Sequence, residues 1–289
     1  MSGAINIKFW GVRGSTPCAN IENMEFGGNT TCLQIEASPI DELLIIDCGT
    51  GLRNLGNHLL NHDKKLNGRI FITHPHWDHL QGFPFFKPFY KNEAWFRVYM
   101  PPQKDVSCVE ILQGHMSNTF FPVTIDMLLA DMNCESFSPG TLNLDGYSVE
   151  YMWARHTVPT AIYKFRIGGK VIIFGPDNEL PLSTDSEEDE AFVEEFRAFV
   201  KDADVLIHDG QFNGEQHKER IGWGHSCWER VIEVTKTCGI KKLVLTHHDP
   251  DSTDDYLEGL NENLKKNFQE GFGEAFFVKE GQDISLPLS

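Results

Sequence analysis

The sequence lacks several features that would assign it to common classes of protein. Its seven cysteines are odd in number and scattered, and no two form a CxxC pair. This pattern argues against a disulfide framework and against a zinc site built from thiolates. No run of about 18 apolar residues occurs, and the first residues show no basic segment leading into an apolar stretch. We therefore expect reduced thiols in a cytoplasmic protein that is neither secreted nor inserted in a membrane.

Basic residues are also scarce. The chain has 25 lysines and arginines against 42 aspartates and glutamates, which gives a formal net charge of −17. Proteins that bind nucleic acids gain affinity by neutralising phosphates with basic side chains, so this balance disfavours a nucleic-acid partner. Part of the acidity lies in residues 185–195, a run typical of a solvated loop that enters a helix. A small anionic substrate at a metal centre meets less of this repulsion.

The length and composition are those of one globular enzyme domain. With 289 residues, 40% hydrophobic and 23% charged, the chain can bury a substantial core, and no linker or internal repeat is visible. We predict a single domain over residues 1–289. The aromatic-rich, irregular segment 84–131 is interpreted as an insertion beside the functional site. The sequence does not indicate an oligomeric state, and it is compatible with a homodimer.

Strand and helix patterns recur along the chain. Apolar, β-branched segments predict strands, and helical periodicity with capping residues predicts helices. Glycine pairs in 27–29 and 168–169 favour antiparallel hairpins over βαβ units. The last third alternates helix and strand, which favours two packed sheets with helices outside. The predicted strands are 5–9, 32–36, 43–47, 69–73, 96–100, 148–153, 161–167, 171–174, 205–208 and 243–246, and the predicted helices are 52–60, 109–115, 188–200, 227–237 and 256–268.

The most informative segment is THPHWDHLQG, residues 73–82, which follows the apolar run Ile70, Phe71 and Ile72. It places three histidines and an aspartate within six positions. Imidazole and carboxylate ligands together favour zinc, manganese or iron. Side chains two residues apart on an extended segment point the same way, and the following turn can direct the others to the same point. The segment therefore predicts a metal-dependent hydrolase.

Three further candidate ligands each follow an apolar strand. His156 comes after YMWAR, Asp177 after VIIFGP and His247 after KLVLT. The ends of several strands can converge at one edge of a sheet, which is what a ligand site needs. We therefore expect these three side chains to meet the histidines of residues 73–82.

This pattern resembles the metallo-β-lactamase superfamily, whose HxHxDH motif is matched by His74, His76, Asp78 and His79. Five further segments resemble its phosphodiesterase branch, near ribonuclease Z and the cyclic-nucleotide phosphodiesterases. They are FWGVRGSTP (9–17), GGNTTC (27–32), IDCGTG (46–51), GWGHS (222–226) and LTHHDP (245–250).

The resemblance implies an α/β fold of the αββα four-layer sandwich type with two divalent metal ions. Zinc is the favoured metal, with manganese and iron as alternatives. Two ions about 3.5–4 Å apart can share a water, lower its pKa toward about 7 and bind phosphoryl oxygens, so hydroxide attack on phosphorus is expected. By resemblance, one ion is held by His74, His76 and His156, the other by Asp78, His79 and His247, and Asp177 bridges them.

Other residues take expected roles beside the ligands. Asp78 could also orient the attacking water or accept its proton. His225 resembles the histidine that contacts phosphate or protonates the leaving group. Asn29 and Thr30 could donate to the substrate phosphate. A similar glycine-containing loop contains Arg13 and Ser15. We expect Asp47 and Asp209 to organise the site as partners of other side chains. His208 and His248 are expected to be structural.

The leading functional hypothesis is hydrolysis of a small phosphodiester, with a cyclic nucleotide as the favoured substrate. The main alternative is a tRNA 3′-end endonuclease of the ribonuclease Z type, which the acidic charge disfavours. A third hypothesis is a non-catalytic sensor on the same scaffold, which the complete ligand set disfavours. An oxygen reductase of the flavodiiron type would carry a glutamate where this chain has His76.

Overall fold

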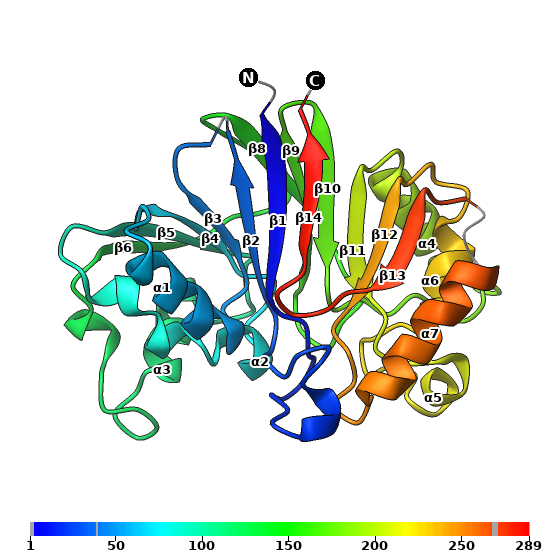
Figure 1. Cartoon of the computed structure of the whole chain (residues 1–289), viewed down its shortest axis with the longest axis horizontal. Helices are drawn as coiled ribbons and strands as arrows, with labels where there is room; N and C mark the ends of the chain where they lie inside the picture. Colours follow the sequence, from blue (N-terminus) through cyan, green and yellow to red (C-terminus); the bar gives the residue numbers. More distant parts are fainter. Residues whose placement is uncertain (1–2, 39, 268–270, 289) are drawn as a thin grey trace.

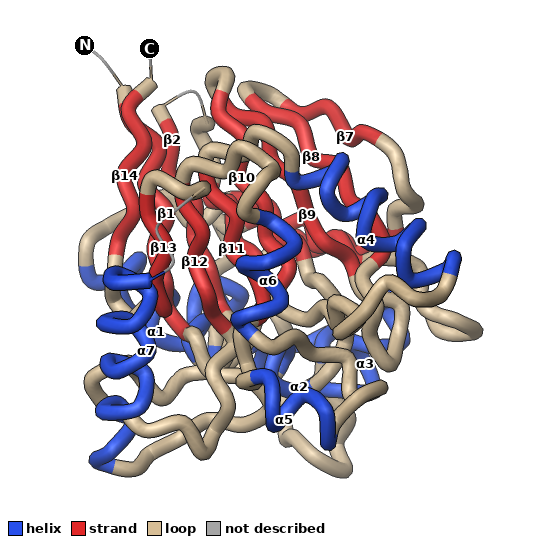
Figure 2. Tube along the Cα trace, turned by 90° about the vertical axis from the view of Figure 1, so that its right-hand side faces the viewer, coloured by secondary structure: helices blue, strands red, loops and turns tan. Residues whose placement is uncertain are grey.

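The computed structural model describes residues 3–38, 40–267 and 271–288. Within these ranges, fourteen strands form two mixed sheets that pack face to face (Figures 1 and 2). The strands of the first sheet are β1 (Ala4–Gly11), β2 (Cys32–Ala37), β3 (Leu43–Ile46), β4 (Gly68–Phe71), β5 (Trp95–Met100), β6 (Asp131–Ser136) and β14 (Asp283–Pro287). Those of the second are β7 (Thr141–Leu144), β8 (Tyr147–Trp153), β9 (Ala161–Ile167), β10 (Lys170–Gly175), β11 (Val205–Asp209), β12 (Lys242–Thr246) and β13 (Glu274–Phe277).

The first sheet has the order β14-β1-β2-β3-β4-β5-β6, and the second has the order β13-β12-β11-β10-β9-β8-β7. The helices are α1 (Gly51–Asn61), α2 (Trp77–Leu80), α3 (Cys108–His115), α4 (Glu187–Val200), α5 (Gly214–Glu219), α6 (Trp228–Thr235) and α7 (Asp254–Asn267). Four short 3-10 turns complete the described elements: Ile21–Asn23, Phe83–Phe85, Lys87–Tyr90 and Ile125–Met127. The helix expected over 256–268 begins earlier, and Phe268 lies outside the described residues.

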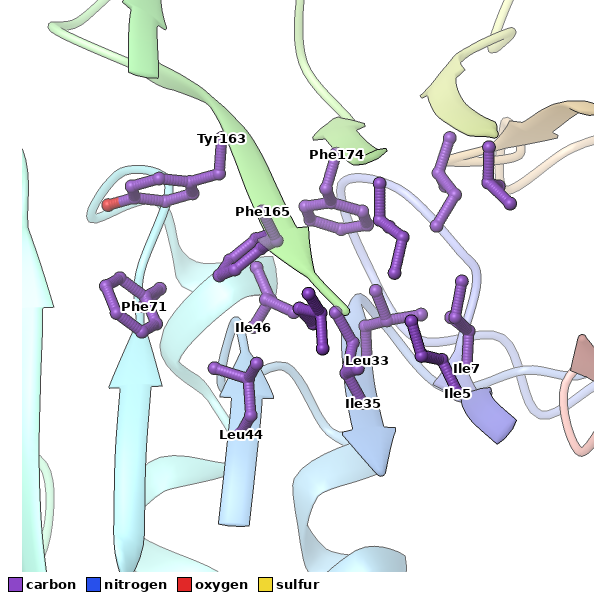
Figure 3. Close-up of a cluster of buried hydrophobic side chains, with 14 of the residues drawn as sticks. Ile5, Ile7, Leu33, Ile35, Leu44, Ile46, Phe71, Tyr163, Phe165 and Phe174 are labelled. Carbon is purple, nitrogen blue, oxygen red and sulfur yellow. The ribbon is translucent and has the colours of Figure 1, made fainter. Parts of the chain in front are cut away.

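A hydrophobic core fills the space between the two sheets. Phe71 of the first sheet stacks on Tyr99 at 5.0 Å between ring centroids, and it meets the edges of Tyr163 and Phe165 from the second sheet. Figure 3 shows Phe71 and branched aliphatic side chains of the first sheet facing Tyr163 and Phe165 of the second. This alternation of inward apolar residues is what a packed pair of sheets requires.

Separate cores cover the two outer faces. Leu52, Leu55 and Leu59 of α1 are buried against strands of the first sheet, because they recur at helical spacing on one face. Val193 and Phe196 of α4 are buried in the same way against the second sheet. Helices α6 and α7 contribute further apolar side chains to this core. The predicted αββα sandwich is therefore confirmed.

The strand connections differ in part from the expectation. The glycine pair at 168–169 does form an antiparallel hairpin between β9 and β10, with φ values of 53° and 80° at its two residues. The turn at 27–29 is not a hairpin, because β1 and β2 pair in an antiparallel way across the long loop 12–31. β3 and β4 run parallel, as do β10, β11 and β12, because helical segments connect them.

Two further findings concern the segment 84–131 and the cysteines. The segment contributes β5, which pairs in parallel with β4 and β6 inside the first sheet. Residues 84–94, before β5, and residues 101–130, between β5 and β6, lie outside the sheet. Cys108 and Cys134 form a disulfide, contrary to the expectation of reduced thiols throughout, and the remaining five cysteines are free and buried. Cys108 and Cys134 are 26 residues apart, and nothing in the sequence indicated that they would pair.

Polar residues gather where strands of both sheets end. Asp47 follows β3, His74 follows β4, Asp177 follows β10 and His247 follows β12. Figure 1 places α2, which carries Asp78 and His79, at the edge of the molecule opposite the two chain ends. Among the described residues, we find no helix with both the length and the apolar content needed to cross a bilayer.

Candidate active site

The seven predicted ligand residues converge at this edge in two adjoining groups. The first group consists of His74, His76 and His156, whose ring nitrogens lie within 4.8 Å of one another. Nε2 of His74 lies 2.9 Å from Nδ1 of His76, and Nε2 of His156 lies 3.1 Å from the same nitrogen. Three ring nitrogens therefore point at one small volume.

The second group consists of Asp78, His79, Asp177 and His247, all of them buried. Oδ2 of Asp78 lies 3.3 Å from Nε2 of His79 and 3.1 Å from Nε2 of His247. Oδ1 of Asp177 lies 3.2 Å from each of the same two nitrogens. The other oxygen of Asp177 lies 3.6 Å from Nε2 of His74, so this carboxylate stands between the two groups.

The donor set fits divalent cations. Nε2 of His79 and Oδ1 of Asp177 are buried without a hydrogen bond to any described residue, so the protein itself does not satisfy them. Burial lowers the pKa of His74 well below its ordinary value, and it also lowers the pKa values of His76 and His156. Neutral imidazole is the form that binds metal. Burial alone would raise the pKa of Asp177, but His247, His79 and His74 hold it well below the usual range.

A second layer of hydrogen bonds orients the ligands. Nδ1 of His79 contacts Oδ2 of Asp47 at 2.8 Å, and Asp47 also accepts the backbone N–H and the hydroxyl of Thr73. Asp47 therefore organises the site as expected. It adopts a φ of 60°, and His247 adopts 61°, a left-handed conformation that side chains rarely occupy.

His225 stands beside the second group. Its ring stacks on that of His247 with 5.0 Å between centroids, and its Nδ1 lies 2.9 Å from Oδ2 of Asp209. Asp209 thus partners His225, whereas the sequence suggested that it would hold a ligand histidine. Burial lowers the pKa of His225, but the adjacent carboxylate of Asp209 outweighs it and raises the value to about 8.

Glu179 is part of the site but was not predicted from the sequence, and Gly224 was predicted only as a member of the segment GWGHS (222–226). The carboxylate of Glu179 accepts the backbone N–H groups of Gly222 at 2.9 Å and Gly224 at 2.7 Å. The carbonyl oxygen of Gly224 in turn lies 2.9 Å from Nδ1 of His156. Glu179 comes two residues after Asp177, and that proximity to a ligand was the signal available in the sequence.

Asn29 and Thr30, the predicted substrate contacts, have other partners. The side-chain amide of Asn29 donates to Glu280 at 2.7 Å. Thr30 is fully buried and exchanges two hydrogen bonds with Thr50. Neither residue belongs to the two ligand groups or to the cavities that border His156 and His225. The side chains of both residues therefore form hydrogen bonds within the protein.

The side chain of Arg13 also forms its hydrogen bonds within the protein. Its side chain is fully buried and donates to the carbonyl oxygens of Gly27 at 2.8 Å, Ser252 at 2.7 Å and Asp249 at 3.1 Å. It fixes the loop after β1 against the loop after β12. The backbone N–H of the neighbouring Ser15 donates to Oδ2 of Asp78 at 2.7 Å. His208 and His248 contact backbone oxygens and are structural, as expected.

The chain is similar to known proteins along most of its length. Residues 43–248 match the family described as Beta-lactamase superfamily domain. The ribonuclease Z of Methanosarcina acetivorans is 25% identical over 310 residues, which cover 92% of this chain and 94% of that protein.

Two solved structures share the fold. The metallo-beta-lactamase fold protein YhfI from Bacillus subtilis superposes with a TM-score of 0.71 at 18% identity, covering 98% of this chain and all of that one. Unliganded yeast PDE1 superposes with a TM-score of 0.67 at 16% identity, covering 99% and 100% of the two chains. The fold implies divalent metal ions, and the histidine and aspartate cluster agrees with it. The chain therefore belongs to the β-lactamase superfamily.

Proposed function

We propose that this protein hydrolyses a phosphodiester bond in a small molecule and that a cyclic nucleotide is its substrate. The observation that carries the proposal is the meeting of seven ligand side chains beside the pair formed by His225 and Asp209. A phosphodiesterase needs a centre that neutralises phosphate charge, an acceptor for the proton of the attacking water and a donor for the leaving oxygen.

The ligand groups divide the metal binding between them. His74, His76 and His156 would hold one divalent cation, Asp78, His79 and His247 the other, and Asp177 would contact both. We favour zinc, while manganese and iron suit the same ligands. When bound, such cations lower the pKa of water and attract the phosphoryl oxygens.

The protein's own groups would move the protons. Within the described part of the chain, the contacts of Asp78 are made by Oδ2, which leaves Oδ1 to accept a proton from the attacking water. Nδ1 of His225 is held by Asp209, so Nε2 is the nitrogen left to face the substrate. We assign His225 the delivery of a proton from Nε2 to the leaving oxygen. Asp209 fixes the ring and stabilises its charged form.

The names of the relatives favour a second candidate, cleavage of precursor tRNA. The full-length similarity to ribonuclease Z supports it. The net charge of −17 opposes it, because a long polyanion needs a basic surface. A sensor without catalysis is opposed by the complete ligand set.

One panel of substrates tests the proposal. Metal-loaded protein is incubated with cyclic AMP, cyclic GMP, a cyclic dinucleotide, bis(4-nitrophenyl) phosphate and precursor tRNA. We expect turnover of the cyclic mononucleotides and the aryl diester. Asp177→Ala should lose both turnover and bound metal, whereas His225→Ala should keep the metal and lose turnover. Cleavage of precursor tRNA alone would establish the second candidate, and full activity of Asp177→Ala would refute the metal assignment.

A further inference from the structure

A cavity of about 500 Å³ opens next to His225. Its lining includes Ser15, Gln211, Phe212, Arg220 and Trp223. Ser15 contacts Asp78 through its backbone N–H, so the cavity reaches the ligand cluster. A substrate bound at the cluster can therefore extend into this space.

The position of His225 identifies which part of the substrate enters the cavity, and this step rests on the proposed function. A group that protonates the leaving oxygen must lie beside that oxygen. Because His225 forms part of the cavity wall, the leaving side of the diester lies in the cavity. In a cyclic nucleotide, the leaving oxygen remains attached to the ribose, which carries the base.

Arg220 has donors to offer there. Its Nη1 is buried without a hydrogen-bond partner, and its guanidinium forms no ion pair with any residue that the structure describes. Its Cζ lies 4.9 Å from the ring centre of Phe212 and 5.7 Å from that of Trp223. Leaving a buried donor unsatisfied costs about 1–3 kcal/mol. In a chain with 42 acidic residues, an unpaired arginine at this place indicates that its partner is a ligand.

Trp223 supplies a flat surface. Its side chain is 59% exposed, although its neighbours Gly222 and Gly224 are held by the carboxylate of Glu179. An exposed indole on a fixed turn is suited to stacking with a planar ring.

The charge of the cavity excludes a second anionic group on the substrate. Asp249 and Asp251 also line the cavity, so a further phosphate would meet two carboxylates. A neutral planar ring with hydrogen-bond acceptors on its edge suits both the arginine and these carboxylates.

We propose that this cavity, formed around Phe212, Arg220 and Trp223, binds the base of the cyclic nucleotide and prefers guanine to adenine. Guanine presents two adjacent acceptors, N7 and O6, which match the paired donors of a guanidinium. Adenine presents one acceptor and one donor at the same edge, so it loses one of the two hydrogen bonds. The exocyclic amino group of guanine can donate to a carboxylate such as that of Asp251.

Steady-state kinetics with cyclic GMP and cyclic AMP test this specificity. We expect kcat/KM for cyclic GMP to exceed that for cyclic AMP by about 10- to 100-fold, which corresponds to the ~1–3 kcal/mol of one bidentate arginine contact. Arg220→Met, which keeps the length of the side chain but removes its donors, should reduce this ratio to about 1. Arg220→Lys keeps the charge but lacks the paired donors of a guanidinium, so it should also lose most of the preference. Arg166→Met, an exposed change on β9, is the matched control and should keep the wild-type ratio.

A binding measurement provides a readout that does not need turnover. By calorimetry, metal-loaded wild-type protein should bind GMP more tightly than AMP by about tenfold or more, and Arg220→Met should bind both equally. Equal kcat/KM values for the two cyclic nucleotides in the wild-type protein would overturn the inference. An equal fractional loss for both in Arg220→Met would do the same. Turnover of bis(4-nitrophenyl) phosphate separates the two proposals, because its absence refutes the phosphodiesterase function, whereas its presence without base preference refutes only this inference.

Discussion

The carbonyl oxygen of Gly224 lies 2.9 Å from Nδ1 of His156, and a Cβ added to Gly224 would lie only 2.2 Å from the same nitrogen. The glycine has a φ of 88°. Both its conformation and its lack of a side chain are therefore needed for the ring of His156 to lie against the turn. One backbone oxygen fixes the tautomer of a predicted metal ligand, so that Nε2 is left to face the cluster.

We expect Gly224→Ala to displace His156 and to weaken the first metal site. Metal content by elemental analysis should fall, and kcat/KM for bis(4-nitrophenyl) phosphate should fall by about 10- to 100-fold, as is usual when a partner of a ligand is lost. Gly222→Ala is the matched control. Gly222 also has a φ of 88°, but nothing lies within 4 Å of its added Cβ. Equal effects of the two substitutions would show that backbone strain, and not the contact with His156, is responsible.

Glu179 should be a positioning residue for the same turn. Glu179→Ala leaves the N–H groups of Gly222 and Gly224 without their charged acceptor, a loss of about 1.5–3 kcal/mol per strong hydrogen bond. We expect lower metal content and kcat. Glu179→Gln keeps an oxygen that can accept both N–H groups, so it should recover most of both. A loss of thermal stability with unchanged metal content and kcat would contradict this role.

Removal of metal should destabilise the folded protein. A cation that binds only the folded state adds about 4 kcal/mol when its concentration is 1,000 times its Kd. A chelator should therefore lower the midpoint of thermal unfolding, and added zinc should restore it. Asp177→Ala should show a much smaller response to both treatments. A midpoint that chelation leaves unchanged would argue against resident cations.

The ion pair between His217 and Glu179 should make stability depend on pH. Nε2 of His217 lies 3.6 Å from Oε1 of Glu179. Burial lowers the pKa of His217, but the contacts with Cys227 and Glu179 outweigh it and raise the pKa to about 9. A pKa raised on folding stabilises the protein fully below the unfolded value of about 6.5. This contribution is lost as the pH rises through about 9.

Urea unfolding between pH 6 and pH 10 measures this effect. The difference in the free energy of unfolding between wild type and His217→Gln should be largest near pH 6 and should shrink as the pH approaches 10. His62→Gln, at an exposed position, serves as the control. A difference that grows with pH would reverse the predicted sign.

The sequence predicted the ligand cluster because its signals are local. Each candidate ligand follows an apolar strand, and strand ends of a layered α/β protein meet at one edge. The partners of Asn29 and Arg13 could not be read in the same way. Asn29 bonds to Glu280, 251 positions away, and Arg13 bonds to the carbonyl oxygen of Ser252, 239 positions away. Contacts at such separations depend on how loops fold together, and residue type alone does not specify them.

The same limit applies to strand pairing. The apolar pattern identified most strands correctly, but it did not distinguish parallel from antiparallel neighbours at β3 and β4. It also missed β6, which alternates exposed and half-buried residues and therefore carries a weak apolar signal. The packing of the helices between successive strands decided the position of each strand in its sheet.

The first and last strands of the fold lie next to each other. β1 and β14 pair with Ala4 opposite Pro287, and Figure 1 shows both ends of the chain at the edge remote from α2. We therefore expect a fluorescent protein or an immobilising tag, fused at either end, to leave the candidate active site open to solution. The same proximity should permit circular permutation, with a short peptide closing the old ends and new ones opened in an exposed loop.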